Sequence, residues 1–202
     1  MKLINIVGKR FNDEGINCKL FMAEQVLKQP VYDWIEYLNK MKSDPTAWQY
    51  SDIQAVHGYE GNGITNYTAD SAAWVYNRKV VQDVPHPFDF WMTETETPSL
   101  TWANALSNAS AMSTAFVHGD ISWWTQWDYV EHYTVLGKSN QMAYAQAQFA
   151  KFVKPGAVRV DAVNYDKNLL VSSFVNTAKY GKNLSTVIIN KGTTPISIKL
   201  SG

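Results

Sequence analysis

Up to about residue 155, short apolar segments alternate with segments of helical periodicity. Apolar runs of strand length lie at 19–23, 53–56, 88–92 and 121–124. Helical patterns lie before, between and after them, over 4–14, 31–38, 70–81, 100–116 and 144–153. Such alternation is typical of parallel strands joined by helical crossovers, because a parallel pair needs a long connection. The sequence therefore predicts an α/β fold over residues 1–155.

The helical periodicity disappears after Pro155. Strand patterns cover residues 157–163, 169–175, 184–190 and 195–200. The last of them alternates most clearly, with Ile196, Ile198 and Leu200 separated by polar residues. We expect residues 156–202 to form a small antiparallel β unit.

Composition excludes several classes of partner. The 202 residues carry 18 basic and 18 acidic side chains, so no positive field exists to hold nucleic acid. Cys18 is the single cysteine, and His86 and His118 lack the spacing of metal ligands. No apolar run is long enough to span a bilayer, and no glycine-rich phosphate loop is present. We expect no nucleic-acid partner, no membrane span, no metal and no cofactor.

Polar and aromatic residues gather where the apolar runs of the first part end. In a parallel sheet, the carboxyl ends of the strands are where ligand sites are built. Glu94 closes the run 88–92, and a carboxylate there is costly to bury without partners, so we interpret it as a functional group. The alternative for Glu94, and for the nearby Glu96, is a cap on the following helix.

Two other runs also end in polar residues that could belong to a ligand site. His57 and Tyr59 follow the run 53–56 and can hydrogen-bond a neighbouring carboxylate, which keeps it ionised. An ordinary turn would explain the same residues. Glu24 closes the run 19–23, and a substrate contact and a polar residue at the start of a helix explain it equally well.

Tryptophans cluster after the fourth run, at Trp123, Trp124 and Trp127. Aromatic rings stack on the apolar faces of sugar rings, so the cluster favours a carbohydrate platform. Because most large aromatic side chains are substantially buried, we expect at least one of the three to belong to the core.

Taken together, these segment ends resemble the second half of glycoside hydrolase family 30. The segments end in Ala23-Glu24-Gln25, His57-Gly58-Tyr59, Thr93-Glu94 and Trp124-Thr125-Gln126-Trp127. The motif Phe-x-Lys-Phe-x-x-Pro-Gly-x-x-Arg-Val at 149–160 is among the more specific marks of that family. The family contains glucosylceramidases, xylanases, glucanases and galactanases.

The resemblance implies half of a (β/α)8 barrel, strands five to eight, over residues 1–155, followed by part of a side β-sandwich over 156–202. It implies a retaining glycosidase for β-linked glycans or glucosides of the xylan, glucan, galactan or glucosylceramide type. Glu94 corresponds to the nucleophile. The implied substrate contacts are Glu24, His57, Tyr59, Trp124 and Trp127.

The same resemblance places the acid/base on strand four, in an Asn-Glu-Pro segment that this sequence lacks. The alternative function is therefore a non-catalytic carbohydrate-binding remnant. Family members are mostly secreted or lysosomal, so the resemblance implies secretion, although residues 1–7 are not a secretory signal.

We also expect the chain to need the missing N-terminal half of the barrel, or to self-associate. A four-stranded sheet would expose two edges and a barrel-facing surface, which we expect to contain Phe21, Val56, Phe90 and Trp123 or their neighbours.

Overall fold

The structure is a computed structural model of the 202-residue chain. It describes residues 1–21, 24–26, 33–59, 64–65, 68–83, 88–95, 101–127, 134–135 and 138–201. Glu96, which the sequence analysis pairs with Glu94, lies outside the described residues.

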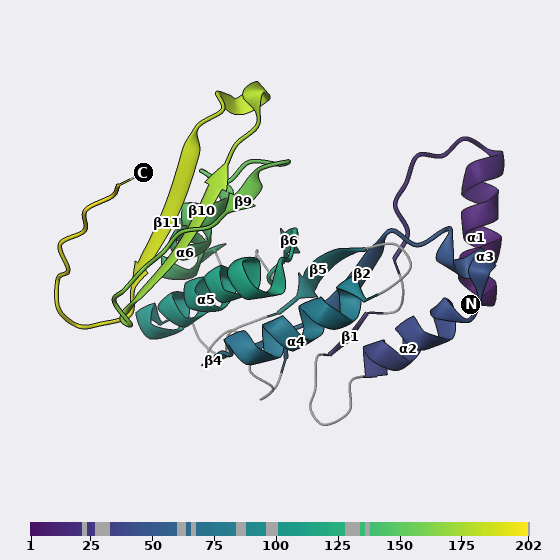
Figure 1. The fold of residues 1–202 in the computed structure, drawn as a ribbon, viewed down its shortest axis with the longest axis horizontal. Coiled ribbons are helices and arrows are strands. Elements are labelled where there is room, and N and C mark those ends of the chain that lie inside the picture. Colours follow the sequence, from purple (N-terminus) through teal and green to yellow (C-terminus); the bar gives the residue numbers. More distant parts are fainter. Residues whose placement is uncertain are drawn as a thin grey trace.

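A four-stranded parallel sheet forms the centre of the molecule (Figure 1). Its strands are β1 (Gln25–Val26), β2 (Ile53–His57), β5 (Asp89–Glu94) and β6 (Trp123–Trp124), in that spatial order. Each strand pairs in parallel with its neighbour, which confirms the predicted α/β alternation. The first strand begins later than predicted, since Phe21 makes only an isolated bridge to Ile53.

Helices follow the strands and cover one face of this sheet (Figure 1). They are α2 (Asp33–Lys42), α4 (Ser71–Gln82) and α5 (Trp102–Thr114), and α5 continues into a π-helical turn, η1 (Ala115–Gly119). Asp70 caps the second of these helices, because its side chain accepts hydrogen bonds from the first turn of α4. Outside this layer lie α1 (Lys2–Asp13), α3 (Pro45–Trp48) and α6 (Gln141–Ala150).

The core lies between the parallel sheet and its helices. Phe90 of β5 stands at its centre, with ring centroids 6.0 Å from Trp34 of α2 and 5.8 Å from Trp74 of α4. Trp74 also packs against Gly119, where a Cβ atom would lie 2.4 Å from the indole ring. Only glycine allows this close approach of η1 to α4, and the approach fixes both helical segments over β5.

The opposite face of the sheet carries a row of partly exposed aromatic side chains. Trp91 stacks on Trp123 with ring centroids 5.1 Å apart, and Phe21 lies 6.5 Å from Trp91. Phe21 is 41% exposed and Trp123 is 50% exposed. Trp91, the neighbour of Phe90, lies on this surface as the expectation allowed, whereas Val56 and Phe90 themselves do not. Both are buried under the helices, because successive side chains of a strand point to opposite faces.

A second, antiparallel sheet follows α6. It contains β9 (Val158–Val160), β10 (Leu169–Val175) and β11 (Leu184–Asn190), with β10 in the middle. The predicted strand at 195–200 is wrong, since these residues form no strand in the structure. Their alternating pattern shows which side chains can share a face, but it does not supply a neighbouring strand with free backbone groups to pair with.

Four further strands of two residues each form short antiparallel pairs. They are β3 (Ile64–Thr65) with β4 (Thr68–Ala69), and β7 (Thr134–Val135) with β8 (Lys138–Ser139). A 3-10 turn, η3 (Ala178–Tyr180), joins β10 to β11.

Asn176 ties the segment after α6 to the antiparallel sheet. Its side-chain oxygen accepts a hydrogen bond from the Lys154 backbone N–H at 2.9 Å, and its side-chain nitrogen donates to the Phe152 backbone carbonyl oxygen at 2.9 Å. The same nitrogen lies 2.7 Å from the Asn183 side-chain oxygen. Asn176 is 2% exposed, so these bonds satisfy a polar group that would be costly to bury alone.

We predict that the chain self-associates through the aromatic row of Phe21, Trp91 and Trp123. Static light scattering at increasing concentration should give an apparent mass above that of the 22.8 kDa monomer. The double variant Phe21→Ser/Trp123→Ser should shift the mass toward the monomer. Trp102→Ser is the matched control, because Trp102 is 62% exposed but lies on α5. A wild-type chain that stays monomeric, or an equal effect of the control, would contradict the prediction.

Candidate active site

Glu94 stands at the carboxyl end of β5, between β2 and β6 in the parallel sheet. The register of β2 against β5 shifts between Val56 and His57, so His57 pairs with Glu94. The next residue, Gly58, donates its backbone N–H to the Glu94 carbonyl oxygen at 2.8 Å. The shift therefore brings the end of β2 over the end of β5. This confirms the expectation that the predicted residues of the two strands lie together.

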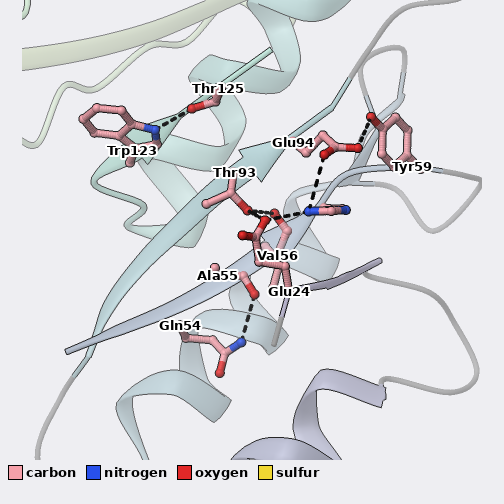
Figure 2. A network of polar contacts seen from close by, with 10 residues as sticks. Glu24, Gln54, Ala55, Val56, Tyr59, Thr93, Glu94, Trp123 and Thr125 are labelled. Carbon is pink, nitrogen blue, oxygen red and sulfur yellow. Dashed lines mark hydrogen bonds and ion pairs between the residues drawn. The ribbon is translucent and has the colours of Figure 1, made fainter. Parts of the chain in front are cut away.

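Two side chains face the Glu94 carboxylate, one from His57 at the end of β2 and one from Tyr59 just beyond it, and Figure 2 shows Tyr59 beside Glu94. The Tyr59 hydroxyl donates a hydrogen bond of 2.7 Å to Oε1 of Glu94. Nε2 of His57 lies 3.8 Å from Oε2, which is an electrostatic contact but longer than a hydrogen bond. The Glu94 side chain is 28% exposed, so one carboxylate oxygen is held while the group stays accessible.

Glu24 joins the same cluster from the beginning of β1. Its Oε2 lies 2.6 Å from Nε2 of His57 and accepts a hydrogen bond of 2.6 Å from the Thr93 hydroxyl. The structure therefore brings both predicted carboxylates to one imidazole nitrogen. Glu24 itself points at protein donors on β2 and β5 (Figure 2).

Thr93 is the member of the cluster that the sequence analysis did not single out. Its hydroxyl lies 2.6 Å from Glu24 and 3.2 Å from the Val56 carbonyl oxygen, and it has a single proton to donate. A signal was present, since Thr93 follows the apolar residues 90–92 and immediately precedes Glu94. That signal could not identify the partner, Glu24, which lies 69 residues away in the sequence.

The tryptophans separate into core and surface. Trp124 is 9% exposed, and its indole N–H donates to the Gln126 side-chain oxygen at 3.2 Å. We therefore correct its assignment from a substrate contact to a core residue, because a buried ring offers no face to a sugar. Trp127 is 52% exposed, and its backbone N–H donates to the Thr95 carbonyl oxygen at 2.7 Å. This bond holds Trp127, with its exposed indole, beside Thr95, the residue that follows the end of β5.

Within the described part of the chain, no group of three His, Cys, Asp or Glu side chains is arranged to hold a metal ion. Among the described helices, none combines the length and the hydropathy needed to cross a membrane. The chemistry that the described cluster offers is that of two carboxylates, an imidazole, a phenol and a hydroxyl group.

Comparison with known proteins gives this cluster its context. The chain is 31% identical over 201 residues to glucuronoxylanase XynC of Bacillus subtilis strain 168, a match that covers 93% of the chain. The GH30 endoxylanase of Clostridium papyrosolvens C71 superposes with a TM-score of 0.69, at 22% identity and over 94% of the chain. The chain is a relative of the family-30 glycoside hydrolases. The resemblance drawn from the strand ends is thus confirmed.

A further family-30 structure agrees with this relationship. Xylanase Xyn30A of Clostridium acetobutylicum, of family 30 subfamily 8, superposes with a TM-score of 0.68 at 24% identity, over 96% of the chain. No protein-family model matches the chain. The chain spans 42% of the XynC relative and 45% of the Xyn30A chain, which is less than half of each.

We predict that Trp124 and Trp127 differ sharply in their contribution to stability. Trp124→Ala should lower the free energy of unfolding by about 3–5 kcal/mol, because it removes a buried aromatic side chain. Trp127→Ala should change it by less than about 1 kcal/mol, as expected for an exposed position. Urea denaturation followed by circular dichroism measures both. Equal losses in the two variants would mean that the separation into core and surface is wrong.

Proposed function

We propose that this chain is the C-terminal half of a retaining family-30 glycoside hydrolase, with Glu94 as the nucleophile. Residues 1–155 would form strands five to eight of the (β/α)8 barrel, and 156–202 would form part of the side β-sandwich. The observation that carries the proposal is the geometry of Glu94. This carboxylate ends a central parallel strand and is held at one oxygen by Tyr59 at 2.7 Å.

The two oxygens of Glu94 suit the two halves of a displacement reaction. Oε1 is held by the Tyr59 hydroxyl, which fixes the carboxylate plane. His57 stands 3.8 Å from Oε2, so this oxygen keeps lone pairs for attack on an anomeric carbon. Attack would form a covalent glycosyl–enzyme intermediate while the leaving oxygen takes a proton from a general acid. Water would then release the sugar from Glu94.

The general acid is proposed to come from outside this chain, on strand four of the complete barrel. A retaining enzyme needs two carboxyl groups about 5 Å apart on opposite sides of the bond that is cleaved. Glu24 is the other carboxylate of the described cluster, and its Oε2 is engaged by His57 and Thr93. This engagement favours a supporting role for Glu24 over proton transfer to a sugar oxygen.

The substrate is proposed to be a β-linked glycan, and xylan is favoured. The matched relatives are named as a glucuronoxylanase and endoxylanases. Glucan, galactan and glucosylceramide remain the other substrates that the family resemblance implies. The exposed Trp127 would stack on a sugar ring next to Glu94, and Tyr59 and His57 would line the same subsite. The resemblance also favours a secreted protein.

A second candidate function is carbohydrate binding without catalysis. It is favoured by the coverage of the relatives, because a chain that spans 42% of XynC carries one proposed catalytic carboxylate and an exposed aromatic platform. Activity of this chain after addition of the remaining barrel half separates the two candidates.

We predict that the chain becomes active on xylan when it is co-expressed with the N-terminal half of a family-30 xylanase. Glu94→Gln should then lower kcat by several orders of magnitude, because an amide cannot form the covalent intermediate. Glu36→Gln is the matched control, since Glu36 is an exposed glutamate of α2. A Glu94→Gln variant with full kcat would disprove the assignment. A complemented pair that folds but stays inactive would favour the binding function.

We also predict that the chain alone binds insoluble xylan through Trp127. Trp127→Ala should weaken binding in a pull-down assay about tenfold, which corresponds to the lower part of the range of about 1–3 kcal/mol for stacking of an aromatic side chain on a nucleic-acid base. Trp102→Ala, an exposed tryptophan on α5, is the control and should bind as the wild type does. Equal loss in the two variants would remove the argument for a platform.

A further inference from the structure

One oxygen atom of Glu24 binds two neighbouring strands at once. Oε2 lies 2.6 Å from Nε2 of His57 on β2 and 2.6 Å from the Thr93 hydroxyl on β5. Glu24 itself immediately precedes β1, so the contacts connect three adjacent strands of the sheet. The Glu24 side chain is 30% exposed and the His57 side chain 21%, so water competes only partly for these bonds.

The contact with Glu24 determines whether Nε2 of His57, the ring nitrogen nearest Glu94, carries a hydrogen. An ionised carboxylate only accepts hydrogen bonds, so the ring nitrogen beside it must carry a hydrogen. That nitrogen, Nε2, is also the one that lies 3.8 Å from Oε2 of Glu94. The positive end of the N–H dipole therefore faces both carboxylates. In the reverse tautomer a lone pair would face them, and Glu94 would meet repulsion.

We propose that Glu24 is a positioning residue that holds His57 with its Nε2–H between the two carboxylates. Glu24 would thus act through His57 on the orientation of Glu94, and it would not touch the sugar or transfer a proton to it. This inference rests on the proposed role of Glu94 as nucleophile.

Thr93 completes the arrangement. Its hydroxyl gives Oε2 of Glu24 a second donor, which limits rotation of the carboxylate away from His57. Thr93 and Glu94 are consecutive in β5, so one residue of the pair faces the reaction centre while the other anchors the support beneath it. The Thr-Glu pair thereby links the proposed nucleophile and its positioning residue in one strand.

The first test uses the chain as it is and needs no activity. A ring N–H held by Glu24 should exchange slowly enough with water to give a downfield signal in ¹H–¹⁵N spectra, assigned by its loss in His57→Gln. The signal should persist in Glu24→Gln, which keeps an acceptor oxygen, and in Glu36→Gln. It should vanish in Glu24→Met, which has a similar shape and no acceptor oxygen. A signal that is absent from the wild type, or retained in Glu24→Met, overturns the inference.

The second test measures kcat and KM on xylan in the complemented chain. Misplacement of a reacting group by about 1 Å can cost about 10²-fold in rate, so we expect Glu24→Met to lower kcat by about that factor. Glu24→Gln should recover most of this loss, and KM should change less than about threefold in both variants.

The outcomes of this test separate the two proposals. If Glu24→Gln is as poor as Glu24→Met, the carboxylate itself reacts and the inference is wrong. A rise in KM at unchanged kcat would instead make Glu24 a sugar contact. Loss of kcat in Glu94→Gln with no effect of Glu24→Met would leave the proposed function standing and remove the inference alone. Full kcat in Glu94→Gln would remove the proposed function.

Discussion

The site depends on the parallel pairing of β2 with β5 and on the irregularity at its end. From Ile53 to Val56 the two strands run in register, and after Val56 the register shifts by one residue. Without the shift, His57 would pair with Thr93 instead of Glu94. The shift turns His57 and Tyr59 toward the Glu94 carboxylate, and the Gly58 N–H bond to the Glu94 carbonyl oxygen closes the pairing. Such irregularities recur beside active sites because they redirect side chains.

The helix layer explains why this pairing is held firmly. Phe90 and Met92 of β5 are buried on the side of the helices, with Phe90 between Trp34 and Trp74. Trp91 and Thr93, which alternate with them, therefore point to the other side. The side of β5 that faces the helices fixes the strand, and the other side carries the Thr93 hydroxyl that binds Glu24. One strand thus serves both the core and the candidate site.

Sequence patterns predicted the elements whose signals are local. The bounds of β10 and β11 follow from residues within each segment. The sequence also predicted that Glu24, His57 and Glu94 share an edge of the sheet, because parallel strands bring their carboxyl ends together. It could not predict the Thr93 bond or the burial of Trp124. Both depend on contacts between segments far apart in the chain.

The bonds of Asn176 bear on how this chain can be divided. The change of pattern at Pro155 suggests a place to cut the gene, yet the backbone just before it, at Phe152 and Lys154, is hydrogen-bonded by a side chain of the second sheet. A piece that ended at residue 155 would lose the Asn176 partner of that backbone, and in the remaining piece the buried Asn176 amide would lose both backbone partners and keep only neighbours such as Asn183. Limited proteolysis or subcloning at this point would therefore damage both products. The first stable cut is one that keeps β10 and β11 with α6.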